Sequence, residues 1–426
     1  MRRFIVPIVC WVCLAVPSAL ADDARQAQIN LVLDTINSLC GTGDLSGSNA
    51  QAAVPGSWLV GEIRRPTTGP ARLINLRLVL PNLNELEVER RQVNGSLRQF
   101  RVSLSVHTGE SLTPKLLAIA DGNCTVQSGR ELRSAGEAWQ YLDQLDGDLT
   151  TLRWTETLQA PWPDGDNHDG IRVGLIDSGL AYDLPQFRNR LARDPGGIPI
   201  GYDFWDLDPW PYDGDVSRGA FLPIRHGTAV ASVLAREAPK ASLVPYRYPR
   251  PDMSRMGDAV EQAANSGVRI LAVPLGSRNR EDWDTFALAL EKHDILAVVS
   301  AGNDGRDIDH DPIFPAALPS EKILVVTSAD NFGRLAQGSN WGKESVDIMV
   351  PAEKVPVVDF RGASGVASGS SYAVPRVAAL AARVLAQNPD LTARQLRSEI
   401  LSMAVASPFE REGVLASGWI PNPLEP

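Results

Sequence analysis

Three polar residues of this chain lie beside apolar segments, where their side chains could reach a cleft. Asp177 ends an apolar run and is followed by Ser-Gly, which can turn the chain. His226 precedes Gly-Thr and the apolar stretch 229–234, as a histidine at the start of a helix would. Ser371 opens an Ala- and Val-rich helical segment, and Pro375, which a helix tolerates in its first turn, supports a helix start near Ser371. Taken singly, Asp177 is also typical of a turn aspartate, His226 of a structural histidine and Ser371 of a capping serine.

Together, the three residue types could perform nucleophilic catalysis. A serine hydroxyl is a weak nucleophile at neutral pH, so it needs a base to accept its proton and a carboxylate to hold that base in the correct tautomer. Ser371, His226 and Asp177 would supply these roles. The attacked carbonyl oxygen then needs a hydrogen-bond donor, and the amide of Asn303, which follows another apolar run, is suitable. Taken alone, Asn303 is typical of a turn before a glycine.

The elements that must position these residues are short apolar runs that alternate with helical segments. Runs of adjacent apolar residues indicate strands that are covered on both faces, and the segments between them indicate right-handed helical crossovers. The runs are 171–176, 268–273, 295–299 and 323–326. Helices are predicted at 256–265 and at 392–403, where Thr392 and Gln395 have capping-box spacing. The sequence therefore predicts an α/β fold with a doubly wound, mainly parallel sheet, whose sites form at the carboxyl ends of the strands.

The first residues resemble an export signal. Residues 1–21 combine two arginines, an apolar run from Phe4 to Val16 and an Ala19-x-Ala21 site. This predicts a cleaved secretory signal peptide, because the run is shorter than the roughly 20 apolar residues that span a bilayer. No segment after the leader has an apolar run that would predict a transmembrane helix. The formal net charge of −10 becomes −12 when the two arginines leave (−10 − 2), which argues against nucleic acid as a partner.

Residues 22–155 predict a smaller, N-terminal α+β domain. An amphipathic helix is expected from apolar residues at helical spacing, and a hairpin is expected around Asn94-Gly95, before the alternating apolar residues of 100–106. The helical residues are Ile29, Val32, Leu33, Ile36, Leu39 and Cys40. Residues 156–170, rich in Pro and Asp, predict a linker to an α/β domain at 171–426.

The four cysteines divide between the leader and this N-terminal domain. Cys10 and Cys13 lie in the leader, so Cys40 and Cys124 remain. An even pair in an exported protein predicts one disulfide. Neither cysteine has neighbours that would indicate a metal site or a catalytic thiol.

At the candidate residues the chain resembles the subtilisin-like serine peptidases (subtilases, peptidase family S8). The family marks are a strand ending in Asp-Ser/Thr-Gly, a His-Gly-Thr helix start, an Ala-Gly-Asn turn and a Gly-Thr-Ser-Met-Ala-x-Pro segment. All four have counterparts here in the family order, and the similarity extends over 170–404. The resemblance implies that Asp177, His226 and Ser371 form a catalytic triad and that Asn303 donates to the oxyanion.

The same resemblance implies where a substrate binds. Leu275, Gly276, Ala301 and Gly302 would line a cleft in which an extended peptide adds as a strand. Several positions depart from the family pattern, so the chain is a divergent member, although no triad atom is lost. The departures are Pro274 for the usual Ser, Ser370 for Thr, Tyr372 for Met, Arg376 for His and Ala379 for Gly.

The resemblance implies a serine endopeptidase that acts on peptides or proteins through an acyl-enzyme, and the predicted signal peptide implies that it is exported, to the periplasm or the medium. No cofactor is required for this chemistry, and the linker aspartates do not complete a calcium-binding loop, so no metal is predicted. One alternative is a pseudopeptidase that keeps the fold and only binds. A serine esterase is disfavoured because the GxSxG elbow is absent around Ser371. The N-terminal domain is either a removed propeptide or a permanent accessory domain, and cleavage specificity and oligomeric state are not predicted.

Overall fold

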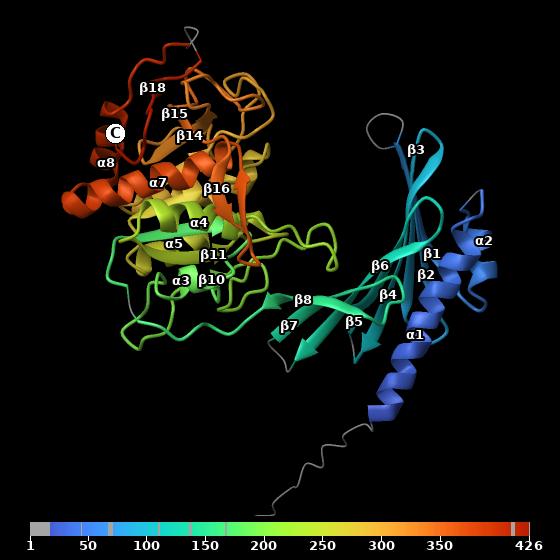
Figure 1. The fold of residues 1–426 in the computed structure, drawn as a ribbon. Coiled ribbons are helices and arrows are strands. Elements are labelled where there is room, and N and C mark those ends of the chain that lie inside the picture. The colour runs from blue at the N-terminus through green and yellow to red at the C-terminus, as the bar shows by residue number, and fades with distance from the viewer. Residues whose placement is uncertain are drawn as a thin grey trace, which may run out of the picture. The chain divides into compact units, whose positions relative to one another are not determined.

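The computed structural model describes residues 18–43, 45–66, 71–109, 111–135, 139–166, 168–409 and 414–425. The chain divides into two compact units (Figure 1). The first unit comprises Met1–Ser134 and Tyr141–Glu156, and the second comprises Ala135–Gln140 and Thr157–Pro426. The predicted apolar run of the leader lies outside the described residues. Within the described ranges, every helix is too short or too polar to cross a membrane.

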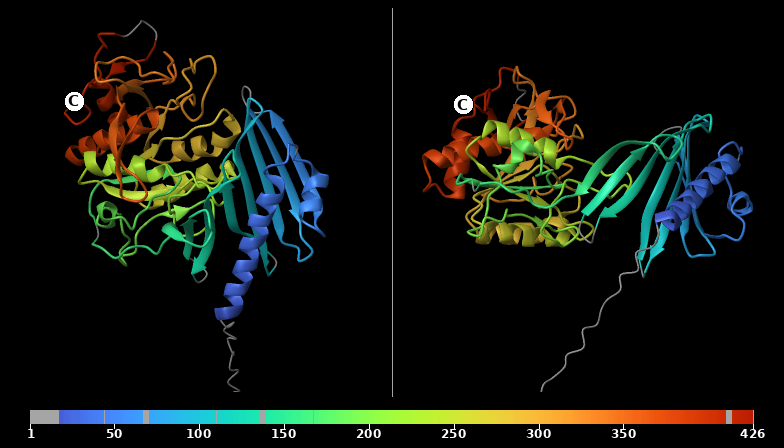
Figure 2. Two further views of the ribbon diagram at one scale, coloured as in Figure 1. Left: turned by 45° about the vertical axis from the view of Figure 1, so that its right-hand side comes forward. Right: turned by 60° about the horizontal axis from the view of Figure 1, so that its bottom comes forward.

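The first unit is one eight-stranded sheet with two helices, α1 (Ser18–Leu39) and α2 (Gly47–Ala53). The strands follow one another in sequence order, and β1 to β6 pair in antiparallel fashion. They are β1 Trp58–Pro66, β2 Ala71–Val79, β3 Glu85–Val93, β4 Ser96–Thr108, β5 Ser111–Ala120, β6 Val126–Ala135, β7 Trp139–Leu145 and β8 Leu152–Gln159. Figure 2 shows α1 lying along one face of this sheet.

The core of the first unit forms where α1 meets β4 and β5. The predicted amphipathic helix is confirmed, since its apolar residues are buried apart from Leu33, which is only partly covered. The predicted hairpin is also confirmed: β3 and β4 pair from Val93 and Ser96 outward, and Asn94 and Gly95 have φ of 52° and 77°. Both central residues of this two-residue turn need positive φ, which asparagine and glycine tolerate best.

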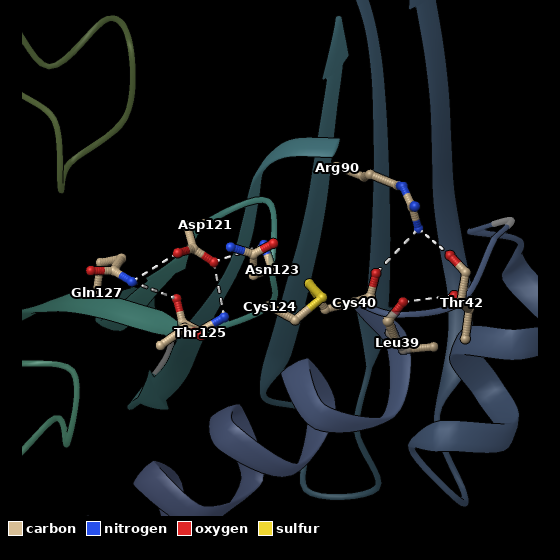
Figure 3. Close-up of a disulfide and its surroundings, with 9 residues drawn as sticks. All are labelled: Leu39, Cys40, Thr42, Arg90, Asp121, Asn123, Cys124, Thr125 and Gln127. Atoms are coloured by element: carbon tan, nitrogen blue, oxygen red, sulfur yellow. Dashed lines mark hydrogen bonds between the residues drawn. A yellow bond between two sulfur atoms is a disulfide. The ribbon is translucent and has the colours of Figure 1, made fainter. Parts of the chain in front are cut away.

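A disulfide joins Cys40, just after α1, to Cys124 in the turn between β5 and β6, with the two Cα atoms 5.6 Å apart (Figure 3). The carboxylate of Asp121 fixes this turn, because it accepts hydrogen bonds from the backbone N–H groups of Asn123 and Thr125 at 2.8 and 3.0 Å. At the Cys40 end of the disulfide, the guanidinium of Arg90 donates to the carbonyl oxygen of Cys40. The disulfide therefore ties the end of α1 to the sheet.

We expect the paired substitution Cys40→Ser with Cys124→Ser to lower the free energy of unfolding of the first unit by about 2–4 kcal/mol, because the bond constrains two residues 84 positions apart in the unfolded chain. Urea unfolding of the full chain, followed by tryptophan fluorescence, measures this loss. A reductant should lower the stability of the wild type alone. Equal midpoints for the wild type and the double variant would contradict the expectation.

The second unit contains an eight-stranded sheet in the order β10-β11-β9-β12-β13-β14-β15-β18, and all its neighbours are parallel. Its strands are β9 Arg172–Asp177, β10 Tyr202–Asp203, β11 Ser242–Arg247, β12 Ile270–Val273, β13 Leu296–Ser300, β14 Ile323–Ala329, β15 Ile348–Pro351 and β18 Gly418–Trp419. A separate hairpin joins β16 Val355–Val358 to β17 Ser364–Ala367. The main helices are α4 Gly227–Glu237, α5 Met256–Asn265, α6 Asp284–Lys292, α7 Ser370–Gln387 and α8 Ala393–Ser402, with a short α3 at Pro185–Arg188 and 3-10 turns at Met253–Arg255 and Arg280–Trp283.

Helices cover both faces of this sheet. Val298 of β13 packs in the cluster that contains α4, α7 and α8, whereas its neighbour Val299 packs in the cluster that contains α5 and α6. Every residue of β13 is therefore buried, which explains why the sequence shows a continuous apolar run rather than alternation. The predicted doubly wound α/β fold is confirmed.

The predicted elements of the second unit agree with the structure, and six strands of its described residues, β10, β11, β15, β16, β17 and β18, are additional. The four apolar runs become β9, β12, β13 and β14, and the helix at 256–265 has the predicted bounds. Thr392 caps α8 in a capping box with Gln395, as predicted. The sequence did not reveal β11, whose apolar pattern is interrupted by Pro245, or β15 as a strand.

Candidate active site

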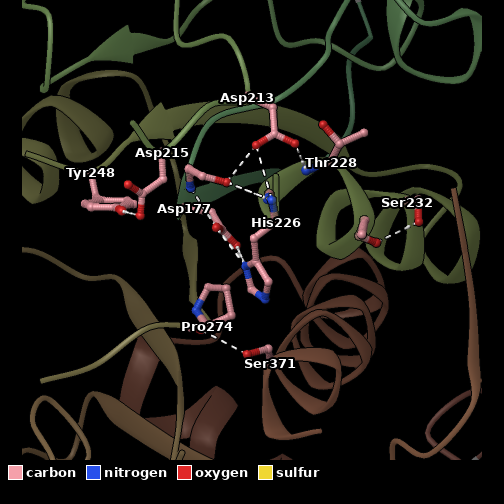
Figure 4. Close-up of polar contacts among 12 residues, drawn as sticks. Asp177, Asp213, Asp215, His226, Thr228, Ser232, Tyr248, Pro274 and Ser371 are labelled. Atoms are coloured by element: carbon pink, nitrogen blue, oxygen red, sulfur yellow. Dashed lines mark hydrogen bonds and ion pairs between the residues drawn. The ribbon is translucent and has the colours of Figure 1, made fainter. Parts of the chain in front are cut away.

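Asp177 is the last residue of β9, at the carboxyl end of the central part of the sheet, and is only 3% exposed. Its Oδ1 accepts a hydrogen bond from the backbone N–H of Ser178 at 2.6 Å. Both carboxylate oxygens lie 2.8 Å from Nδ1 of His226 (Figure 4). This contact places the proton on Nδ1 and leaves Nε2 as an acceptor.

His226 is the N-cap residue of α4, and its side chain does not cap the helix. The following residue, Gly227, allows a close approach to the turn after Asp177, because a Cβ at this position would lie 2.0 Å from the carbonyl oxygen of Gly179. Burial of the imidazole lowers the pKa of His226, but the charge and hydrogen bond of Asp177, together with the charge of Asp213, outweigh burial and raise that pKa above its ordinary value of 6.5.

Ser371 is the second residue of α7, and the N-cap is Gly369 rather than either serine. The hydroxyl of Ser371 donates to the carbonyl oxygen of Pro274 at 3.2 Å. In Figure 4, Ser371 and Pro274 lie opposite the ring of His226. The serine therefore lies in the first helical turn, where the helix dipole favours negative charge.

The predicted place of Pro375 is wrong in detail. Pro375 is the sixth residue of α7 and lies in its second turn, not its first. Because proline has no N–H, the carbonyl of Ser371 loses its helical hydrogen-bond partner four residues on. The residue is buried.

The side chain of Asn303 is held at its oxygen end by the first residue of α7. Its Oδ1 accepts from the backbone N–H of Ser370 at 2.9 Å and from the Ser370 hydroxyl at 3.0 Å. That hydroxyl lies 2.7 Å from Oγ of Ser300, at the end of β13. Since two donors occupy Oδ1, the amide must present its Nδ2 donor on the other side.

Gly369 fits closely against this amide. Its φ of 121° is unfavourable for any residue with a side chain, and a Cβ at this position would lie 2.9 Å from Oδ1 of Asn303. The glycine therefore allows α7 to begin directly beside Asn303.

Two buried polar residues near the site were not singled out from the sequence. Asn340 holds the turn of Asn303, because its Nδ2 donates to the Ala301 carbonyl at 2.8 Å and its Oδ1 accepts from the N–H groups of Asp304 and Arg306. The second residue is Asp213, 13 positions before His226, which lies in a turn-rich stretch without a recognisable motif.

The triad candidates share one cleft of about 290 Å³. Leu275 and Gly276 also line this cleft, whereas Ala301 and Gly302, predicted with them as substrate-binding residues, are not among its lining residues. Ala301 is fully buried after β13, the strand next to β12. The other lining residues are Ser178, Asp215, Ile224, Tyr248, Arg250, Met253, Pro274, Ser277 and Asp282. Among the residues that the structure describes, no group of three or more His, Cys, Asp or Glu side chains could hold a metal ion.

Comparisons with known proteins identify the family of this chain. A model of the subtilase family matches residues 168–417, so the chain belongs to the subtilase family. Among solved structures, a chain from a structure of the subtilase cytotoxin SubAB assembly has a TM-score of 0.51 and 20% identity over 61% of this chain and 90% of that chain. This likeness concerns the fold alone.

Curated relatives are similar over about half of this chain. A thermophilic serine proteinase of Bacillus sp. (strain AK1) is 27% identical over 53% of this chain and 55% of its own length. The cell wall-associated protease and the minor extracellular protease Vpr, both of Bacillus subtilis (strain 168), are 28% and 32% identical over 56% and 51% of this chain. The chain spans about half the length of the first relative and about a quarter of the other two.

We expect the imidazole of His226, followed by NMR in the full chain, to titrate above 6.5, since Asp177 favours the charged ring. In the Asp177→Asn variant the pKa of His226 should fall, because burial remains while the main opposing charge is lost. Asp166→Asn, which removes an exposed carboxylate outside the cleft, is the control. Identical titration curves for the wild type and Asp177→Asn would contradict the assigned contact.

Proposed function

We propose that this chain is an exported serine endopeptidase that hydrolyses peptide bonds through an acyl-enzyme. The observation that carries the proposal is the pairing of Asp177 with Nδ1 of His226 at 2.8 Å, in one cleft with Ser371. Membership of the subtilase family supports the same reading.

The proposed reaction begins with attack of Ser371 Oγ on the substrate carbonyl carbon, while Nε2 of His226 takes the hydroxyl proton. The Oγ–C bond forms, the C–N bond breaks, and His226 returns the proton to the leaving amine. Asp177 holds the imidazole and stabilises its charged form. Water then attacks the acyl-enzyme with the same base, which releases the acid and restores Ser371.

A bound substrate would also redirect the serine hydroxyl. At rest this hydroxyl donates to the Pro274 carbonyl, which is the group that a substrate strand would use as an acceptor. A substrate N–H that takes this carbonyl would release the hydroxyl toward His226. Replacement of the family's usual serine by Pro274 removes an N–H but keeps the carbonyl that this step needs.

Asn303 is proposed as a donor to the oxyanion. The two bonds that hold its Oδ1 leave Nδ2 as the end that can face developing negative charge. A donor that is fixed before the reaction requires no reorganisation during it, which is why such groups contribute strongly to catalysis.

The proposed substrates are peptides or proteins outside the cytoplasm. The leader at 1–21 supports export, and two relatives are named as cell wall-associated and extracellular proteases. The final location is proposed as periplasmic or secreted.

A binding-only pseudopeptidase is the second candidate. The observation that favours it is the Ser371 hydroxyl, whose hydrogen bond goes to Pro274 rather than to His226. Such a protein would keep the cleft and bind an extended peptide without cutting it.

Labelling with a fluorophosphonate probe separates the two candidates. We expect purified, processed wild type to be labelled and to cut an unstructured protein such as casein, and Ser371→Ala to lose both by at least about 10³-fold, because the attacking oxygen is gone. Ser368→Ala, which removes an exposed hydroxyl three residues earlier, is the control and should keep both. Folded protein that shows no Ser371-dependent labelling would favour the pseudopeptidase.

We also propose that the N-terminal region is removed by cleavage in the predicted linker, with a permanent accessory domain as the alternative. Part of this segment is packed: the ring of Trp162 lies 4.2 Å from that of Tyr182, centroid to centroid. The acidic stretch 164–166 is exposed. These observations support cleavage at 164–166 rather than earlier in the linker.

N-terminal sequencing of active wild type is expected to begin within or just after 164–166, because exposed turn-rich chain is the preferred site of proteolysis. If the enzyme cuts itself, purified Ser371→Ala should retain the first unit. Fully active protein with an intact linker would instead identify the first unit as a permanent accessory domain.

A further inference from the structure

A second carboxylate, that of Asp213, lies at the start of α4 and is 0% exposed. Its Oδ1 accepts from the hydroxyl of Ser178 at 2.7 Å and from the backbone N–H of His226 at 3.4 Å, and its Oδ2 accepts from the N–H of Thr228 at 3.0 Å. Figure 4 shows Asp213 beside the backbone of His226, on the side away from Ser371. Its contacts are therefore with the residues that hold the catalytic base, and it is not among the residues that line the cleft.

This arrangement replaces the usual helix cap. The first N–H groups of a helix need acceptors, and the side chain of the N-cap residue commonly provides one. Here the N–H groups of His226 and Gly227 donate to Oγ of Ser178 at 3.1 and 2.9 Å, and that of Thr228 donates to Asp213. The imidazole of His226 is thereby left free to face Asp177.

Ser178 connects the two carboxylates. Its backbone N–H donates to Asp177 and its hydroxyl donates to Asp213, so one residue fixes both groups relative to each other. A buried carboxylate is stable only where hydrogen bonds or charge compensate for lost water, and the N-terminus of α4 supplies both.

We propose that Asp213 is a positioning residue for the general base: it caps α4 in place of His226, fixes the histidine backbone against Asp177, and adds a second negative charge that favours the imidazolium. This inference rests on the proposed peptidase function. Asp213 itself touches neither the substrate cleft nor the reacting atoms.

The groups around His226 make the charge contribution measurable. Asp177 faces it from β9, Asp213 from the segment before α4, and Tyr372 from α7, with ring centroids 6.0 Å apart. The neighbouring Arg225 directs its guanidinium elsewhere, to the Thr157 carbonyl. Burial, followed by the charges of Asp177 and Asp213, raises the pKa of Tyr372 to about 12, so Tyr372 stays neutral while His226 titrates.

The test is Asp213→Asn in the full, processed chain, with kcat/KM measured against pH. An amide keeps the size and one acceptor oxygen but loses the charge and presents N–H to Thr228. One of the charges that raise the pKa of His226 is lost, so the acidic limb of the kcat/KM profile of this variant should move to lower pH. The plateau should fall by about 10- to 100-fold through misplacement of the base, with KM little changed.

Two further variants separate charge from position. Ser178→Ala removes the hydroxyl that accepts from the N–H groups of His226 and Gly227, so the plateau of kcat/KM should fall. Because both carboxylates remain, the acidic limb of the profile should shift less than that of Asp213→Asn. Asp330→Asn is the matched control, since Asp330 also accepts two backbone N–H groups but lies in the turn after β14, and it should leave the profile unchanged.

An acidic limb of Asp213→Asn that coincides with that of the wild type, at equal titrated active sites, would overturn the proposal. If Asp213→Asn does not fold, Ser178→Ala decides, and an unchanged plateau would overturn it. If the wild type proves inactive, the peptidase proposal fails by itself. The NMR titration of His226 then still tests Asp213, whose loss must lower the pKa of that ring.

Discussion

The contact between the carboxylate of Asp177 and Nδ1 of His226 is the interaction on which the rest of the site depends. It joins the end of β9 to the start of α4 across 49 residues of sequence. The contact requires a close approach of the two backbones, which Gly227 permits because no Cβ could fit against the carbonyl of Gly179. The parallel sheet supplies the rigid edge from which both groups are presented, since each strand ends at the same side.

The two helices that begin at this edge, α4 and α7, both have their first N–H groups bound by acceptors from other segments. A helix start has unsatisfied N–H groups, and a polar side chain at that position would normally accept from them. In α4, Ser178 and Asp213 take the N–H groups. In α7, Oδ1 of Asn303 takes the N–H of Ser370. In α4 these acceptors free the N-cap residue His226, and in α7 Asn303 supplies the acceptor that the N-cap Gly369 lacks.

This shared feature explains what the sequence could and could not predict. Strand ends, helix starts and the order of Asp177, His226, Asn303 and Ser371 follow from local patterns and from the resemblance. The capping contacts join distant segments: Ser178 and Asn303 lie in motifs that do not reveal their helix partners, and Asp213 lies in no motif. The eight-stranded sheet of the first unit was only partly visible, because strands with one exposed face and mixed polar residues give weak alternation outside the hairpin at β3 and β4.

One departure from the family pattern supports the packing of two helices beside the candidate site. Arg376, where the family usually has His, donates from Nε to both carboxylate oxygens of Glu237 at 3.1 Å and from Nη1 to the carbonyl of Pro351. Glu237 is the last residue of α4, so this nearly buried ion pair ties α4 to α7. A buried pair gains little net stability over apolar packing, because desolvation opposes the attraction, but loss of one partner would strand a charge. The pair therefore serves mainly to fix how the helix that carries His226 packs against the helix that carries Ser371.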